Sequence, residues 1–184
     1  MRIISGRFRG RRLKGPRGMD LRPTSDRLKE TLFNILAPEI SGSRVLDVFA
    51  GTGAIGLEAL SRGAQQVVFI ESSQEAVQLI RQNLALCGIT TGFRILPGDV
   101  FAALRTLARE AFEADITFLD PPYHWGPYRD LLEILFGSGI APPGSRVVIE
   151  HHRKSLLPES GTGFRCVRTV KQSEKCLSFY QSID

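Results

Sequence analysis

The sequence of 184 residues is 42% hydrophobic and 23% charged, which fits one globular domain large enough to bury a sizeable core. No apolar run approaches the ~20 residues of a membrane span. The three cysteines form no CxxC pair and the three histidines show no ligand spacing relative to them, so we expect reduced thiols in a cytoplasmic protein and no metal.

The amino-terminal arm, residues 1–18, is strongly basic. It holds seven basic residues and no acid, a charge of +7, and subtracting this from the total of +5 leaves −2 for the rest of the chain. Alternation in IISGRFRGRRL predicts a short hairpin. A transit peptide and a solvated tail stay open as alternatives. Because basic clusters neutralise phosphates, we expect the arm to bind a polyanion through Arg2, Arg7, Arg9, Arg11 and Arg12.

The elements that follow predict a doubly wound α/β core over residues 22–184, which together with the arm makes one domain over residues 1–184. Residues 22–37 combine capping residues with apolar residues at helical spacing, and Pro38 is expected to end this helix. Short apolar runs then alternate with helical segments, the pattern of a parallel sheet covered on both faces. The expected strands are 45–49, 67–70, 93–96, 116–119 and 147–149, the expected helices are 54–62, 73–86, 100–111 and 127–136, and a closing antiparallel hairpin is expected over 164–171 and 175–181.

The loop GTGAIG, residues 51–56, lies between the first strand and the next helix and predicts nucleoside binding through the backbone. Glu71 ends the following strand, where a carboxylate accepts hydrogen bonds from a ribose diol. Asp99 ends the third strand and could accept from an adenine amine or only cap a helix. NAD fits the spacing, but Asp47 within the strand disfavours a pyrophosphate. S-adenosylmethionine (SAM) fits better, because its sulfonium tolerates a nearby carboxylate.

The stretch FLDPPY, residues 118–123, ends the fourth strand at the edge of the sheet where ligands bind. The two prolines fix φ and extend Asp120, so the chain cannot continue as a helix. A carboxylate, one or two carbonyls and the Tyr123 ring then suit the exocyclic amine of a flat base. During methyl transfer, Asp120 would stabilise the positive charge that develops on nitrogen. The alternative is a strand that merely ends in a proline-rich turn.

Five stretches narrow the interpretation: RIISGRFRGRRL, RPTSDRLKETLFNIL, LDVFAGTGAIGLEALSRGA, DPPY and the terminal LSFY. Together they resemble the RsmD family, bacterial 16S ribosomal RNA (guanine-N2)-methyltransferases. The resemblance implies a seven-stranded, Rossmann-like SAM-dependent methyltransferase fold and an assembling small ribosomal subunit as substrate. The sequence departs from the family pattern at Gln172-Ser173-Glu174, where relatives often carry a glycine before the last strand.

The resemblance also implies roles for individual residues. Acceptor residues are Asp120, Pro121, Pro122 and Tyr123, and cofactor contacts come from Asp47, Phe49, Gly51, Gly53, Glu71, Asp99 and Val100. Arg22 and Thr24 would help to cover the cofactor, and the arginines of the arm would grip RNA. Glu150, His151 and His152 are interpreted as ordinary strand-end residues. The chain is expected to act as a monomer; DNA adenine-N6 methylation and a non-catalytic RNA-binding role in assembly stay open.

Overall fold

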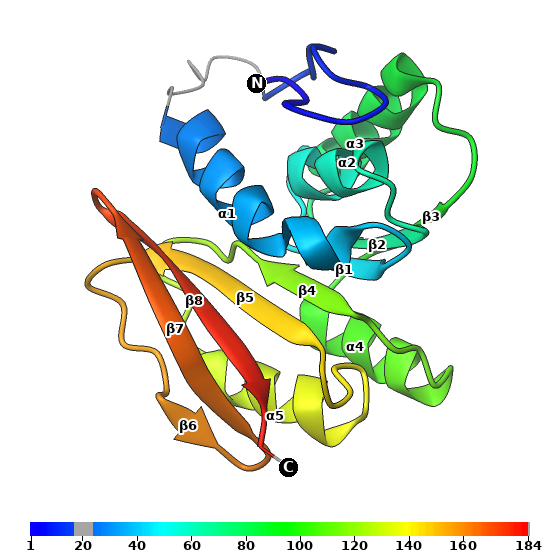
Figure 1. The fold of residues 1–184 in the computed structure, drawn as a ribbon. Helices are drawn as coiled ribbons and strands as arrows, with labels where there is room; N and C mark the ends of the chain where they lie inside the picture. Colours follow the sequence, from blue (N-terminus) through cyan, green and yellow to red (C-terminus); the bar gives the residue numbers. More distant parts are fainter. Residues whose placement is uncertain (17–23, 184) are drawn as a thin grey trace.

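The computed structural model describes residues 1–16 and 24–183, with the backbone alone for residues 24–26. One mixed sheet runs in the order β3-β2-β1-β4-β5-β8-β7-β6 (Figure 1). The strands are β1 Arg44–Val48, β2 Gln66–Glu71, β3 Phe93–Pro97, β4 Ile116–Leu119, β5 Arg146–His152, β6 Ser160–Gly161, β7 Phe164–Gln172 and β8 Lys175–Ser182. The helices are α1 Thr24–Ile40, α2 Ala54–Ser61, α3 Gln74–Cys87, α4 Val100–Arg109 and α5 Tyr128–Gly137.

Strands β1 to β5 pair in parallel, and β8 joins β5 antiparallel to close the sheet with β7. The predicted α/β architecture with its antiparallel hairpin is therefore confirmed. The described sheet has one strand more than the seven expected, because the two-residue β6 pairs with the start of β7. No helix in the described part of the chain is both long and apolar enough to cross a membrane.

Successive side chains along the central strands point to opposite faces of the sheet and pack into two separate hydrophobic cores. Val45 and Phe118 pack with α1, α2 and α3 on one face, whereas Leu46 and Leu119 pack with α4 and α5 on the other (Figure 1). Each central strand is apolar on both faces because helices cover both. This arrangement leaves the carboxyl ends of the parallel strands as the edge at which polar side chains gather.

Three local features differ from the prediction or qualify it. Helix α1 continues through Pro38 to Ile40, although proline removes a helical hydrogen bond; Ile40 is buried, and its packing holds the last turn in place. The amino-terminal hairpin is closed by one isolated antiparallel bridge between Arg2 and Arg12 instead of a strand ladder. In the β7–β8 turn, Ser173 takes a φ of 59°, a left-handed conformation that glycine adopts more readily.

Candidate active site

A cavity of about 180 Å³, the first cavity, lies at the carboxyl ends of the central strands and beneath α1. It brings together residues from the first loop, from the end of β4 and from β1, β5 and β8. Its lining includes Asp47, Phe49, Gly51, Asp120, Glu150 and Lys175. Among the residues that the structure describes, this lining leaves out Gly53, Glu71, Asp99 and Val100. Two stretches about 70 residues apart, the glycine loop and the Asp-Pro-Pro-Tyr motif, therefore meet at one cavity, as predicted.

The glycine loop turns sharply between β1 and α2. Phe49, Gly51 and Gly53 all have positive φ, of 58°, 54° and 75°, and Gly53 donates its backbone N–H to the Ala50 carbonyl at 2.7 Å. Gly56 serves packing, since a Cβ at this position would lie 2.2 Å from the Phe69 ring. The turn brings the start of α2 to the carboxyl end of β1, where the helix dipole favours anionic groups.

Glu71 holds this loop from the end of β2. Its Oε2 accepts the Gly51 N–H at 2.8 Å, and its Oε1 accepts the Ser73 N–H at 2.8 Å. A carboxylate has about four acceptor positions, so these two bonds leave capacity for a ribose diol. Asp99 is exposed and caps α4 by accepting the Ala102 N–H at 3.0 Å, while Val100 is buried in the second core.

Asp47 places a carboxyl group at the base of the first cavity. It is 2% exposed and its Oδ2 accepts the Gly56 N–H at 2.9 Å. Burial raises the pKa of Asp47 to about 8, and the negative charges of Asp120 and Glu71 act in the same direction, while the bond from Gly56 opposes the shift. Such a site favours a cation, because a neighbouring positive charge would stabilise the ionised form of Asp47.

The Asp-Pro-Pro-Tyr motif reaches the first cavity through Asp120. The backbone N–H of Asp120 donates to the Val48 carbonyl at 3.3 Å, which fixes the motif beside β1. The Pro122 carbonyl accepts the Trp125 N–H at 2.8 Å and so closes a turn. Of the two proline carbonyls, Pro121 is therefore the better candidate for a substrate acceptor. The Tyr123 ring is 64% exposed, and this leaves a face for stacking.

The chain matches the family model described as Conserved hypothetical protein 95 over residues 1–181. Ribosomal RNA small subunit methyltransferase D of Escherichia coli K12 is 38% identical over 181 residues, which are 98% of this chain and 89% of that protein. Its Haemophilus influenzae counterpart is 34% identical over 164 residues, 88% and 85% of the two chains. The chain belongs to the RsmD family of methyltransferases.

Solved structures agree with this membership of the RsmD family. YhhF from Escherichia coli matches with a TM-score of 0.82 and 34% identity over 99% of this chain and 97% of that one. A hypothetical protein from Thermus thermophilus matches with a TM-score of 0.81 and 31% identity over 97% and 98%. SMU.776, solved with SAH, has a TM-score of 0.71 at 13% identity over 88% and 50%, a likeness of fold alone.

A second cavity of this RsmD-family protein, about 400 Å³, adjoins the first. Asp120, Glu150 and Lys175 line both cavities, and Pro121 and Tyr123 line the second. Sequence reasoning took Glu150 for an ordinary strand-end residue and overlooked Lys175. The register could have revealed Glu150, because Leu119 pairs with Ile149, so that Asp120 and Glu150 are the next residues along two neighbouring parallel strands.

The charges around Asp120 are coupled. Although Asp120 is open to the cavities, desolvation by the surrounding protein raises its pKa to about 7, the charge of Glu150 adds to this, and Lys175 opposes it. The Lys175 Nζ forms an ion pair with Glu150 Oε1. Burial opposes the charge on Lys175, but Glu150 and Asp120 outweigh it and raise the lysine pKa. Asp120 can therefore exchange a proton near neutral pH.

Aromatic contacts join the two motifs. Trp125 packs edge-on against Phe49 at 5.2 Å and Tyr128 at 5.0 Å, and it stacks on Phe101 at 6.3 Å between ring centroids. Trp125 lines neither of the two cavities and instead packs the turn after the Asp-Pro-Pro-Tyr motif against the first loop. The Tyr123 ring meets the His152 ring edge-on at 5.1 Å, which places it at the mouth of the second cavity.

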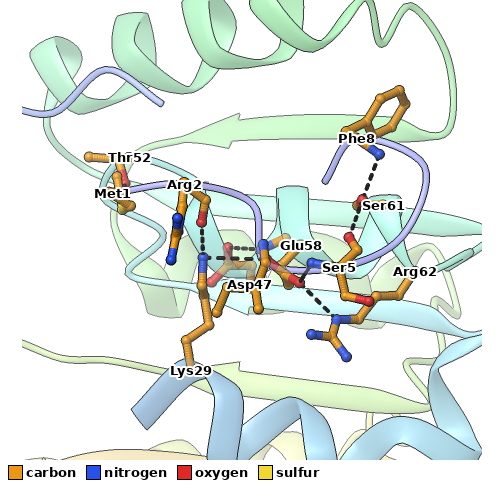
Figure 2. A network of polar contacts seen from close by, with 12 residues as sticks. Met1, Arg2, Ser5, Phe8, Lys29, Asp47, Thr52, Glu58, Ser61 and Arg62 are labelled. Carbon is orange, nitrogen blue, oxygen red and sulfur yellow. Dashed lines mark hydrogen bonds and ion pairs between the residues drawn. The ribbon is translucent and has the colours of Figure 1, made fainter. Parts of the chain in front are cut away.

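The basic arm is docked on α2 and α3. Arg2, Arg7, Arg9, Arg11 and Arg12 are all exposed, whereas Ile3 and Leu13 are buried in the first core. The fully buried carboxylate of Glu58 accepts the N–H groups of Ile4 at 2.7 Å and Ser5 at 2.9 Å (Figure 2). The same carboxylate contacts Lys29 at 3.3 Å and Arg62 at 2.8 Å.

Two predicted site residues, Arg22 and Thr24, belong to the segment that was expected to cover the cofactor. Arg22 lies outside the described residues, and Thr24 begins α1 with only its backbone described, so the predicted cover over the cofactor stays a prediction. Across residues 1–16 and 24–183, no group of three or more His, Cys, Asp or Glu side chains is placed to hold a metal ion.

Proposed function

We propose that this methyltransferase transfers the methyl group of SAM to the exocyclic N2 amine of a guanine in 16S ribosomal RNA. The observation that carries the proposal is that Asp120 lines both cavities, so a base amine in the second cavity would face a cofactor in the first. RNA binding is supported by the exposed arginines of the arm and by the printed names of the RsmD relatives.

The residues around the first cavity fit SAM. Asp47 supplies a buried carboxyl group that favours a cation, Glu71 retains acceptor capacity for a ribose, and the loop over residues 49–53 presents its backbone. Asp99 and Val100 would meet the adenine. When bound, SAM supplies a methyl group made electrophilic by its positively charged sulfur.

The acceptor residues would orient the amine. Asp120 and the Pro121 carbonyl accept its two N–H bonds, and Tyr123 stacks on the ring. This arrangement aims the nitrogen lone pair at the methyl group, and positioning of this kind is worth several kcal/mol. Asp120 stabilises the positive charge that then develops on nitrogen. Because the methylated ammonium is acidic, a weak base such as Asp120 or a water suffices to remove its proton.

The arm and the segment that contains Arg22 and Thr24 extend the site toward the polymer. We assign the arm to RNA phosphates and the Arg22–Thr24 segment to covering the cofactor. The substrate is an assembling small subunit in the cytoplasm, and the enzyme acts as a monomer.

The first experiment replaces Asp120 by alanine. Methyl transfer from tritiated SAM to unmethylated small subunits should fall by about 10²–10³-fold or more, as when one pre-organised charge-stabilising group is lost. SAM binding by calorimetry should be retained. Asp130→Ala, at an exposed position in the first turn of α5, serves as the matched control. Near-normal turnover of Asp120→Ala would end the proposed mechanism.

A second experiment distinguishes the substrates. The enzyme is incubated with tritiated SAM and either small subunits or DNA, and the labelled nucleoside is identified by mass spectrometry. Label on N2 of guanine in the RNA supports the proposal. Label only in DNA would favour adenine-N6 methylation, since the same acceptors could hold that amine. RNA binding without any transfer would favour a non-catalytic assembly protein.

A further inference from the structure

We infer that Glu150 and Lys175 read the N1–H and O6 edge of the target base and thereby select guanine over adenine. The inference rests on the proposed function, because it concerns the base held in the second cavity. The acceptor motif would hold the amine, and two residues from other strands, Glu150 on β5 and Lys175 on β8, would determine which base is accepted.

The sheet places the three polar groups in sequence along the edge of the second cavity. Asp120 follows β4, Glu150 lies near the end of β5, and Lys175 begins β8; these three strands are neighbours in that order. Leu119 pairs with Ile149, so Asp120, just past the end of β4, and Glu150, within β5, follow at the same level on neighbouring parallel strands. Parallel strands lie about 4.8 Å apart, close enough for one flat base to touch side chains from both.

The Glu150 carboxylate is held in place. Its side chain is 12% exposed, and its Oε1 forms an ion pair with the Lys175 Nζ. Lys175 pairs across β5 and β8 with His152, and its side chain is 49% exposed toward the second cavity. An ammonium group has three donors, so one bond to Glu150 leaves others for a ligand. A mostly buried acceptor, Glu150, and a half-exposed donor, Lys175, therefore stand side by side next to Asp120.

This order matches the Watson–Crick edge of guanine. Beside its N2 amine, guanine carries the N1–H donor and then the O6 acceptor, so Glu150 accepts from N1–H and Lys175 donates to O6. Adenine offers a bare N1 lone pair beside its amine, which would face the Glu150 carboxylate acceptor against acceptor. The pair thus favours guanine through both an attractive contact and a repulsive one.

Alternatively, Glu150 and Lys175 could only position Asp120 or set its protonation state, without contacting the base. Glu150 and Lys175 do act on Asp120 electrostatically, so replacing either of them would change the pKa of Asp120. The two roles predict different outcomes with a base analogue. A residue that only positions Asp120 changes the rate for every acceptor amine, whereas a residue that reads N1–H changes the ratio between bases.

The test compares guanine with 2-aminopurine at the methylated position. The position is first mapped by mass spectrometry, and small-subunit RNA is then ligated with either base and reassembled. 2-Aminopurine keeps the C2 amine but has a lone pair at N1 and a hydrogen in place of O6. The wild-type enzyme should prefer guanine in kcat/KM by about 10- to 100-fold, the range of one good hydrogen-bonded base contact.

In Glu150→Gln this preference should fall toward one. The amide can turn its NH2 group to the N1 lone pair of 2-aminopurine, so activity on the analogue is kept or rises while activity on guanine falls by about 10- to 100-fold. Lys175→Met should also reduce the preference, since it removes the O6 donor. Glu133→Gln, an exposed carboxylate on α5 paired with Arg129, should leave both activities unchanged. SAM binding by calorimetry checks that each variant is folded.

The outcomes separate the two claims. If the wild-type enzyme methylates no guanine in subunit RNA, the proposed function fails and the inference fails with it. If it methylates guanine and Glu150→Gln keeps the wild-type preference over 2-aminopurine, only the inference is overturned. An equal loss on both bases would reduce Glu150 to a positioning residue.

Discussion

The glycine loop and the basic arm lie side by side on α2 and are built in opposite ways. The loop is held mainly by residues near it in the sequence: Asp47 accepts from Gly56, Ala50 accepts from Gly53, and Glu71, at the end of the next strand, accepts from Gly51. The arm is held by side chains 50 to 70 residues away, namely Glu58, Ser61 and Asn83. A loop of the first kind can be recognised in sequence, whereas an arm of the second kind shows only its exposed charges.

One residue joins the two regions. Asn83, fully buried on α3, donates to the Lys14 carbonyl at 3.1 Å and to the Thr52 carbonyl at 3.0 Å, and it accepts the Lys14 N–H at 2.7 Å. The arm and the loop therefore share an anchor. Substitutions of the residues that anchor the arm should therefore also affect the cofactor site, whereas substitutions of the exposed arginines of the arm should not.

The largest effect is expected from Glu58→Gln. This substitution removes the buried charge on which two backbone N–H groups, Lys29 and Arg62 converge, and breaking a buried ion pair costs about 3–5 kcal/mol. Urea denaturation should show a loss in the free energy of unfolding near this range. Glu110→Gln breaks the exposed pair with Arg94 and should lower the free energy of unfolding far less, because solvent screens that pair. Equal losses in the two variants would show that Glu58 does not anchor the arm.

A smaller loss of stability is expected in the glycine loop. Gly56→Ala forces a Cβ to within 2.2 Å of the buried Phe69 ring, and overpacking of this kind costs about 1–3 kcal/mol. Gly51→Ala meets only the Phe49 carbonyl at 4.0 Å but places alanine at a φ of 54°. It should cost about 1 kcal/mol, as expected for backbone strain, while lowering SAM affinity more than Gly56→Ala does. Chemical denaturation and calorimetry separate the two effects, and the reverse ranking would contradict the packing argument.

These two regions also show how far sequence reasoning reached. The bounds of the central strands, the sharp loop and the meeting of Asp47 with Asp120 followed from hydrophobic runs and from parallel topology. The docking of Glu58 was not predictable, because its partners are backbone N–H groups of a distant segment. Lys175 was missed for a related reason: only the antiparallel pairing of β8 with β5 carries it to Glu150. Short β6 offered no apolar run to detect.

The pH dependence of stability should single out Asp47. Its pKa rises from 3.8 to about 8 in the folded protein, so between these values the folded state holds a proton that the unfolded state releases. Raising the pH through this window therefore destabilises the fold at this residue. Relative to wild type, Asp47→Asn should become more stable from pH 4 to pH 8, and the difference should level off above about pH 8. A difference that stays constant with pH would show that Asp47 titrates normally.

SAM binding should depend on pH in the opposite direction to stability, because the positive charge of SAM favours the ionised form of Asp47. The affinity of the wild-type enzyme for SAM should increase as the pH rises toward 8, and that of Asp47→Asn should change less. Calorimetry at several pH values measures both. Parallel pH profiles for the two proteins would place the cofactor charge away from Asp47.

The smallest effect on stability is expected at the exposed surface of the arm. Deleting residues 2–14 would test RNA binding poorly, because it would remove the buried Ile3 and Leu13. Arg9→Gln with Arg12→Gln leaves these anchors intact and should change the free energy of unfolding by less than about 0.5 kcal/mol. The log–log salt dependence of binding to small-subunit RNA should nevertheless flatten by about 0.7–0.9 for each phosphate that the variant no longer binds.

The matched control for the arm is Arg105→Gln with Arg109→Gln. Both arginines are exposed on α4, which covers the opposite face of the sheet from the arm, and the double variant loses the same charge (Figure 1). A change in net charge alone would flatten the salt dependence equally in the two double variants. Contact between the arm and RNA would flatten it only in the arm variant, because counterions are released where phosphates are bound. An unchanged slope in both would leave the arginines of the arm as a solvated surface and assign RNA binding to another part of the enzyme.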